Sequence, residues 1–395
     1  MELMAANDTD KLQQAFRELT PTAPRLFHAP GRVNLIGEHT DYNDGFVLPV
    51  AIDRGTTVAG AKRDDRRVRV RSLNMEETVE FDLDVPGDSQ RGIWLDYVEG
   101  MARTLEARGV RLCGADLALH SDIPDGAGLS SSAALEISVG MALLTLSGAR
   151  MDRVALALAG QEAEHKYVGT RCGIMDQLTV TCARAGHALL IDCRTLENIY
   201  IPLDTASTAI VVADTGIKHR LASSAYSERR AECERAVEIL REPLPHIRAL
   251  RDVCVADFER HQMILPEPVR SRCKHVVTEN KRALLAAQAL HSGDVAKMGR
   301  LVNCSHKSLR DDYEVSCAEL DVMVKSAQSL PGATLGARMT GGGFGGATVN
   351  LVRRDALEGF PDAIALDYLW ITNISPSIYV VEASDGAVEI TDGNV

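Results

Sequence analysis

The chain has 395 residues, of which 45% are hydrophobic and 25% are charged, the proportions of a soluble globular protein. Its formal net charge of −12 excludes a general positive field of the kind that attracts nucleic acid or an anionic membrane surface. At this length one hydrophobic core is unusual, and we expect two lobes, residues 1–207 and residues 208–395.

Strand and helix patterns alternate along the chain. The elements predicted in the first half are a helix at 9–19, strands within 45–83, a helix at 94–107, a strand at 115–120 and helices at 129–147 and 154–167. Those predicted in the second half are strands at 187–192 and 209–214, a helix at 223–240, a mostly helical region at 245–330 and strands at 347–352 and 377–382. Strand pairs and helix pairs in this order favour an α+β fold over a doubly wound βαβ sheet.

The cysteines and the chain start indicate the compartment. Nine cysteines, an odd number without a Cys-x-x-Cys pair, are expected to be free thiols in a reducing environment, and none has zinc-site spacing. Residues 1–5 lack a basic, apolar leader, and no apolar run is long enough to span a membrane. We therefore expect a cytoplasmic protein.

The most informative segment is residues 30–49. Within ten residues, Arg32, Glu38, His39 and Asp41 supply a cation, two carboxylates and an imidazole beside the apolar pair at 35–36. A site for a polyhydroxylated ligand needs such a density of polar groups, because each buried hydroxyl requires a hydrogen-bond partner. The alternative is a solvated turn, since Gly, Asn, Asp and Thr all favour turns.

A second motif, residues 123–136, follows a predicted strand and opens a long apolar helix. Gly126 and Gly128 allow the backbone to approach a ligand closely, and three serines follow at the helix start. Free N–H groups and the helix dipole favour an anion there. The spacing is neither that of a Walker A loop nor that of a Rossmann fingerprint. The pattern predicts a phosphate-binding loop; an ordinary serine cap is the alternative.

A third motif joins residues 162–166 to residues 173–177. Glu164 lies late in a predicted helix, and Asp176 stands in an apolar context shortly after Gly173. This setting is typical of a functional carboxylate. The alternative is that Asp176 caps a helix beginning at Gln177.

A fourth motif, residues 336–346, contains five glycines within its last six residues. Ordering so many glycines costs conformational entropy, so a folded protein retains them where its backbone must come close to something else. The alternative, a flexible linker, is disfavoured by the β-branched strand that follows immediately.

These four segments, in this order, resemble the GHMP kinase superfamily and, within it, the galactokinase family. The resemblance extends over most of the chain, from Leu26 to about Glu382. It implies two α+β lobes with the active site between them, the N-terminal lobe being similar to ribosomal protein S5. It also implies an ATP-dependent sugar kinase that converts D-galactose to galactose 1-phosphate.

The resemblance further implies roles for matching residues. Asp176 would be the catalytic carboxylate and Arg32 its electrostatic partner. The residues expected to bind galactose are Glu38, His39, Asp41, Gly173 and Tyr226. Those expected to hold the triphosphate of ATP are Gly126, Ala127, Gly128, Leu129, Ser130, Ser131 and Ser132. Ser132 and Glu164 would hold Mg²⁺.

Three other functions are compatible with parts of the pattern. A kinase for N-acetylgalactosamine would need room for the acetamido group. A kinase for mevalonate or homoserine is disfavoured by the opening motif. A non-catalytic sensor of galactose and ATP would have a shortened serine and alanine stretch, whereas residues 130–134 are complete here. We expect small-molecule substrates and no nucleic acid, membrane or obligate protein partner.

Overall fold

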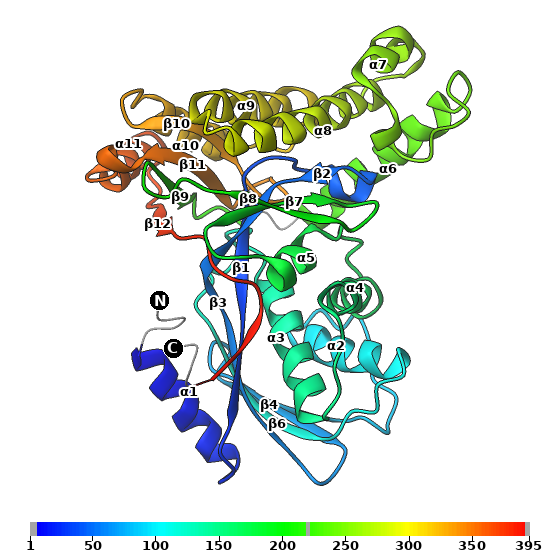
Figure 1. Cartoon of the computed structure of the whole chain (residues 1–395), viewed down its shortest axis with the longest axis vertical. Helices are drawn as coiled ribbons and strands as arrows, with labels where there is room; N and C mark the ends of the chain where they lie inside the picture. The colour runs from blue at the N-terminus through cyan, green and yellow to red at the C-terminus, as the bar shows by residue number, and fades with distance from the viewer. Residues whose placement is uncertain (1–5, 219–221, 392–395) are drawn as a thin grey trace.

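The structure is a computed structural model that describes residues 6–218 and 222–391. A six-stranded sheet forms its lower lobe (Figure 1). The strand order is β13-β1-β3-β6-β4-β5, and every neighbouring pair is antiparallel except β4 and β6. The strands are β1 (Arg25–Asn34), β3 (Pro49–Lys62), β4 (Arg67–Ser72), β5 (Glu77–Asp82), β6 (Ala115–Ser121) and β13 (Val388–Ile390).

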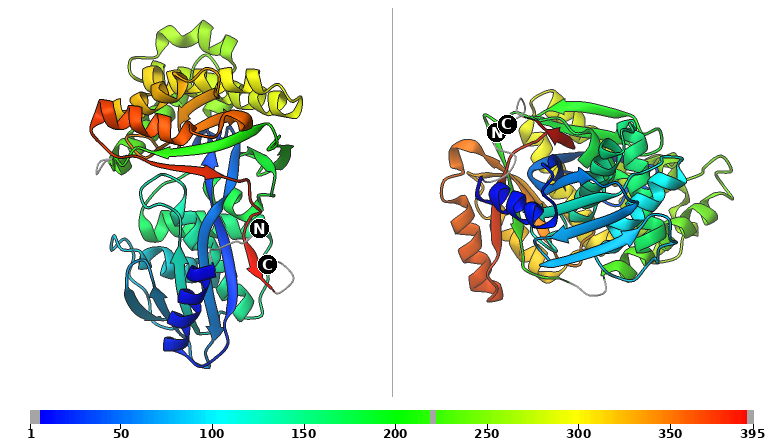
Figure 2. Two further views of the ribbon diagram at one scale, coloured as in Figure 1. Left: turned by 90° about the vertical axis from the view of Figure 1, so that its left-hand side faces the viewer. Right: turned by 90° about the horizontal axis from the view of Figure 1, so that it is seen from below.

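Helices cover both faces of this sheet, as the view from below shows (Figure 2, right). Helix α1 (Ala6–Leu19) packs Leu12 and Phe16 against Ala59, whereas Val58 on the opposite face of β3 joins the core under the other helices. This division follows from the two-residue period of a strand. The helices on that second face are α2 (Leu95–Ala107), α3 (Ser131–Leu146), α4 (Arg153–Ala163) and α5 (Met175–Cys182).

The upper lobe is built on an antiparallel four-stranded sheet of order β10-β11-β9-β12. Its strands are β9 (Thr208–Asp214), β10 (Thr334–Met339), β11 (Ala347–Arg353) and β12 (Ser377–Val381). The helices of this lobe are α6 (Ala222–Leu240), α7 (Val255–His261), α8 (Val269–His291), α9 (Val295–Ser308), α10 (Ala318–Gln328) and α11 (Phe360–Thr372). A smaller sheet of β2 (Phe46–Val47), β7 (His187–Asp192) and β8 (Asn198–Pro202) lies where the lobes meet (Figure 1).

The chain crosses between the lobes again at its end. After β12 it descends along the lower lobe and forms β13, which pairs with β1 (Figure 2, left). On the way, the amides of Gly386 and Ala387 donate to the carbonyls of Ala183 and Val180, at the end of α5. The proposed division at residue 207 stays a prediction. β13 comes after that division in sequence but belongs to the sheet of the lower lobe.

The α+β prediction is confirmed, and the predicted helices and strands are present with shifts of a few residues. Among the strands and α-helices, five were not predicted: β1, β8, β10, α11 and β13. Helix α5 was considered only in the alternative interpretation of Asp176. The predicted helix at 154–167 is α only to Ala163 and continues as a π-helical turn, Glu164–Val168. Residues 1–5 and 219–221 lie outside the described parts. Within those parts, no helix has both the length and the apolar character needed to cross a membrane.

Candidate functional site

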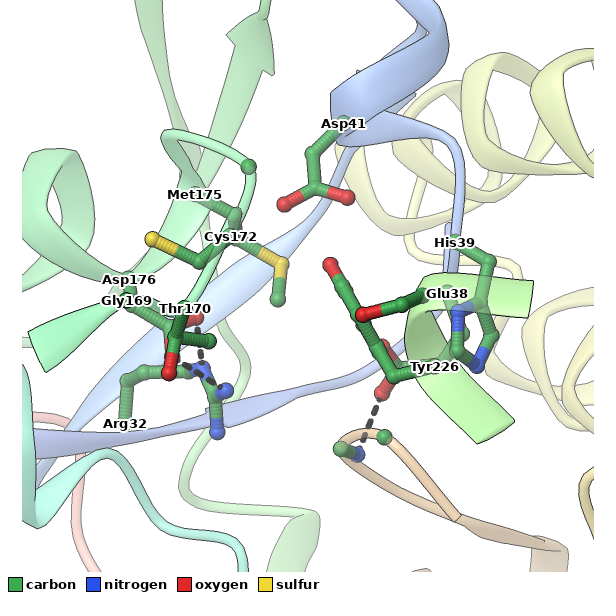
Figure 3. A pocket seen from close by; sticks show the side chains of 14 residues that line it. Arg32, Glu38, His39, Asp41, Gly169, Thr170, Cys172, Met175, Asp176 and Tyr226 are labelled. Atoms are coloured by element: carbon green, nitrogen blue, oxygen red, sulfur yellow. Dashed lines mark hydrogen bonds and ion pairs between the residues drawn. The ribbon is translucent and has the colours of Figure 1, made fainter. Parts of the chain in front are cut away.

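A cavity of about 200 Å³ lies between the lobes and collects most of the predicted polar residues. Seven predicted residues line it: Arg32, Glu38, His39, Asp41, Gly173, Asp176 and Tyr226. Figure 3 shows them arriving from different segments, with Arg32 and Asp176 on one side and Glu38, His39 and Tyr226 on the other. The lining residues not assigned from sequence are Gly169, Thr170, Cys172, Met175, Ser227, Gly341 and Gly342.

Arg32 and Asp176 form a two-pronged ion pair at the edge of this cavity. Nε and Nη2 of Arg32 donate to the two carboxylate oxygens of Asp176, and both donor–acceptor distances are 2.7 Å. The remaining guanidinium nitrogen, Nη1, donates to the carbonyl of Gly128 at 2.7 Å, and the hydroxyl of Ser130 donates to Asp176 at 2.6 Å. Such paired charged hydrogen bonds fix both position and orientation. The carboxylate is therefore held in a fixed position and orientation beside the second motif.

Local structure explains how Asp176 reaches this position. Helix α5 begins at Met175, so Asp176 lies in its first turn, where the helix dipole favours a negative charge. Arg32 comes from β1, directly after a bulge between Pro30 and Arg32. The alternative that Asp176 merely caps a helix starting at Gln177 is wrong, because its carboxylate is bound to Arg32 and Ser130.

Asp41 enters the cavity from the 3₁₀ turn Asp41–Asn43. A Cβ added to Gly173 would come within 1.8 Å of Asp41 Oδ2, so glycine is required there for the carboxylate to fit. Burial, reinforced by the charge of Asp176, raises the pKa of Asp41 to about 7. A hydrogen-bond donor beside this carboxyl would favour its ionised form.

Glu38 connects the cavity to the fourth motif. Its Oε1 accepts hydrogen bonds from the Gly341 amide at 2.7 Å and the Thr340 hydroxyl at 3.2 Å, and lies 3.1 Å from Nη2 of the fully buried Arg338. The same loop also touches the second motif, since a Cβ on Gly341 would lie 3.1 Å from the Gly128 carbonyl oxygen. The glycine-rich segment is thus a packed part of the site, and the flexible-linker alternative is wrong.

The second motif forms a turn between β6 and α3, as predicted. Ser130 is the residue before the helix, in a left-handed conformation with φ 63°, and Ser131 and Ser132 occupy the first turn. Sequence reasoning assigned Ser130 to phosphate binding; in the structure its hydroxyl binds Asp176. A cation beside the loop was missed: Lys218 donates to Asp125 at 2.6 Å, and its side-chain carbons lie against Gly126. No motif surrounds Lys218, so no local pattern could have indicated its position beside the loop.

Glu164, expected to hold a metal ion, is a buried carboxylate at the end of α4. It accepts hydrogen bonds from the Gln177 amide at 2.8 Å and from the Cys172 thiol at 3.3 Å. Burial raises its pKa to about 7, with the thiol opposing and the charge of Asp176 adding to the shift. Residues 6–218 and 222–391 contain no group of three acidic, His or Cys side chains placed to hold a metal. Glu136 shares the Gln177 amide with Glu164, so two buried carboxylates lie here. Carboxylate oxygens suit Mg²⁺, which completes its shell with water and phosphate oxygens.

Family models match three parts of the chain. A model described as the galactokinase galactose-binding signature matches residues 14–62, and the N-terminal domain model of the GHMP kinases matches residues 96–184. The C-terminal model of the GHMP kinases matches residues 286–365. All four sequence motifs fall within these three matched segments.

Individual proteins extend this similarity over the whole chain. The galactokinase of Roseiflexus sp. (strain RS-1) is 50% identical over 386 residues, covering 98% of each chain, and that of Chloroflexus aggregans is 53% identical, covering 87% of this chain and 88% of its own. A crystal structure of Lactococcus lactis galactokinase complexed with galactose superimposes with a TM-score of 0.92 at 36% identity, covering 97% of this chain and all of that one. The mevalonate kinase of Methanococcus jannaschii shares the fold, with a TM-score of 0.63 at 17% identity over 91% of this chain and 98% of its own.

The raised pKa of Asp41 predicts a measurable pH dependence of stability. The folded protein holds this proton up to about pH 7, whereas the unfolded chain releases it near pH 4, so the folded state loses stability as pH rises from 4 to 7. Asp41→Asn removes this penalty. We expect it to exceed the wild type in unfolding free energy by up to about 4 kcal/mol at pH 8, with a much smaller difference at pH 4.

Urea titrations at several pH values measure this difference. Asp362→Asn, on the exposed surface of α11, is the matched control and should leave the pH dependence unchanged. A constant difference between Asp41→Asn and the wild type across the whole pH range would contradict the prediction.

Proposed function

Because this chain belongs to the galactokinase family, we propose that it transfers the γ-phosphoryl group of ATP to the anomeric hydroxyl of D-galactose, giving galactose 1-phosphate and ADP. The observation that carries the proposal is the Arg32–Asp176 ion pair at the edge of the cavity. It stands between the polar groups suited to a sugar and the loop suited to a phosphate. Phosphoryl transfer depends mainly on such positioning and on charge stabilisation.

Galactose is proposed to bind to Glu38, His39, Asp41, Gly173 and Tyr226. Support comes from their meeting in one cavity and from their chemistry. Two carboxylates accept hydrogen bonds from sugar hydroxyls, and the rings of His39 and Tyr226, with centroids 5.7 Å apart, form one wall. Burial raises the pKa of Asp41, and a sugar hydroxyl that donates to this carboxyl would favour its ionised form.

Asp176 is proposed as the catalytic carboxylate. It lines the cavity, and the sugar hydroxyl that attacks the phosphorus can pass its proton to it. Arg32 holds the carboxylate in place. Because Arg32 is only 5% exposed, its charge is weakly screened by water and interacts strongly with charge that develops on the phosphoryl group. Whether the proton moves early or late, the hydroxyl is oriented by the same contact.

ATP is proposed to bind with its phosphates against residues 126–132. The amides at the start of α3 point out of the helix and offer donors to phosphate oxygens. Ser132 and Glu164 would hold Mg²⁺, which supplies charge neutralisation on the phosphates. A cytoplasmic location is part of the proposal and is supported by the nine cysteines, all of which are free.

A substrate panel tests the proposed reaction. ADP release should require Mg²⁺-ATP together with galactose, and the product should be the 1-phosphate. Glucose, N-acetylgalactosamine, mevalonate and homoserine should give little release. Release with N-acetylgalactosamine equal to that with galactose would favour the first alternative. Binding of galactose and ATP without any release would favour a sensor.

Two substitutions test the catalytic pair. Asp176→Asn should lower kcat by about 10³-fold or more, because the amide cannot accept the proton. Arg32→Ala should cost on the order of 10² in rate. Calorimetric titration with galactose should still detect binding by Asp176→Asn. Near-normal turnover of that variant would remove Asp176 from the catalytic role.

The metal assignment predicts a selective defect. Glu164→Gln should weaken binding of Mn²⁺ in the presence of ADP, measured by electron paramagnetic resonance, by about tenfold. Galactose binding should change far less. Glu162→Gln is the matched control, because its carboxylate binds Arg108 and Lys166. An unchanged Mn²⁺ affinity in Glu164→Gln would contradict the assignment.

A further inference from the structure

His39 has one ring nitrogen fixed by the protein and one left for a ligand. Its backbone is left-handed, with φ 63°, a conformation that costs energy for a residue with a side chain. Nδ1 lies 2.9 Å from the Tyr42 hydroxyl, whereas buried Nε2 has no hydrogen-bond partner among residues 6–218 and 222–391. Because His39 lines the cavity, Nε2 is the nitrogen available to a bound sugar.

A chain of hydrogen bonds leads away from Nδ1 into the upper lobe. The Tyr42 hydroxyl lies 2.7 Å from the Tyr313 hydroxyl, which in turn lies 3.2 Å from the Cys233 sulfur. Tyr313 is fully buried and Cys233 is 1% exposed. Neither Tyr42 nor Tyr313 lines the cavity, but both contact His39, which does, and Tyr42 also packs against the Tyr226 ring with centroids 5.2 Å apart.

The hydrogen bonds from His39 to Cys233 must all run in the same donor-to-acceptor direction. Burial lowers the pKa of His39 well below its ordinary value and raises the pKa of Tyr42 and of Tyr313 well above theirs, so all three groups are neutral. Each phenol then has a single hydrogen to donate. If Tyr42 donates to His39, Tyr313 donates to Tyr42 and the thiol donates to Tyr313; otherwise every bond reverses.

The acidity of the groups selects between the two directions. A phenol is a much stronger acid than the N–H of a neutral imidazole, and an imidazole nitrogen is a better acceptor than a phenol oxygen. The bond between Tyr42 and His39 is therefore stronger when the phenol donates. That direction places the hydrogen of the imidazole on Nε2.

We propose that Tyr42 and Tyr313 are positioning residues that hold His39 in its Nε2–H form, so that the ring presents a hydrogen-bond donor to a galactose oxygen. This inference rests on the proposed function. It gives the cavity one donor opposite the acceptors Glu38 and Asp41. A hydroxyl can donate to a carboxylate and accept from His39 at once, so this arrangement selects an oxygen at one place on the sugar.

Ring packing holds the imidazole in the required orientation. The His39 and Tyr313 ring centroids are 4.7 Å apart, and His275 packs 4.5 Å from the centroid of Tyr313. His275 is itself held between the Ser308 hydroxyl and the Glu38 carbonyl. Tyr313 and His275, which do not line the cavity, thus help to set the orientation of His39.

Nitrogen NMR of the ¹⁵N-histidine-labelled, sugar-free protein tests the tautomer directly. We expect His39 to show a protonated Nε2 and an unprotonated Nδ1 across neutral pH, with its signals assigned by their loss in His39→Gln. Tyr42→Phe should produce a mixture of both tautomers. A protonated Nδ1 in the wild type would overturn the proposal, whether or not galactose proves to be the substrate.

Kinetics test the consequence for the sugar. Tyr42→Phe should raise KM for galactose about twofold, because a ring divided evenly between the two tautomers has the binding form half the time, while kcat and KM for ATP stay unchanged. Tyr313→Phe should act in the same direction and serves if Tyr42→Phe folds poorly. Tyr368→Phe, which removes another buried hydroxyl that donates to the Thr215 carbonyl, is the matched control and should leave all three constants unchanged.

Monodeoxygalactoses separate a positioning role from a structural one. The sugar that lacks the oxygen bound by His39 should bind the wild type and Tyr42→Phe equally well. The other deoxy sugars should retain the full difference seen with galactose. An equal penalty for galactose and every deoxy sugar would overturn the proposal. Failure of the wild type to phosphorylate galactose would instead refute the proposed function and leave the NMR result to decide the tautomer.

Discussion

The ion pair between Arg32 and Asp176 is the constraint on which the arrangement of the site depends. It joins the central sheet, through β1, to the first turn of α5, and the third guanidinium nitrogen binds the loop before α3. Three segments distant in sequence are thereby fixed around one buried cation. A buried guanidinium without its carboxylate would be costly, so folding favours the arrangement that brings Arg32, Asp176 and the Gly128 loop together.

The second constraint is close contact between backbones. The glycine-rich loop of the upper lobe lies against both the Gly128 turn and the carboxylate of Glu38, whose charge is balanced by buried Arg338. The lobes are therefore joined at the site by hydrogen bonds and van der Waals contact. On the lower side, Gly173 leaves the space that Asp41 occupies. Each glycine motif is explained by a neighbouring atom, which a flexible loop would not require.

The sequence predicted the site better than the elements around it. Polar residues such as Glu38 and Asp41 stand beside glycines in short motifs, so their chemistry could be recognised locally. β13 has three residues and is stabilised by pairing with β1, more than 350 positions away, so no local pattern indicates it. The contact of Tyr42 with Tyr313 spans 271 residues and was unpredictable for the same reason. The phosphate-binding role predicted for Ser130 stays a prediction, and its hydrogen bond to Asp176 depends on tertiary structure that no local pattern indicates.

The return of the chain to β1 has a consequence for synthesis on the ribosome. The segment that forms β13 also binds the end of α5, the helix whose first turn carries Asp176. Until residue 390 has emerged, one edge of the lower sheet is open and α5 lacks its last support. The nascent chain therefore presents an unpaired strand edge during most of translation, the kind of surface that chaperones bind and that other unfinished chains can join.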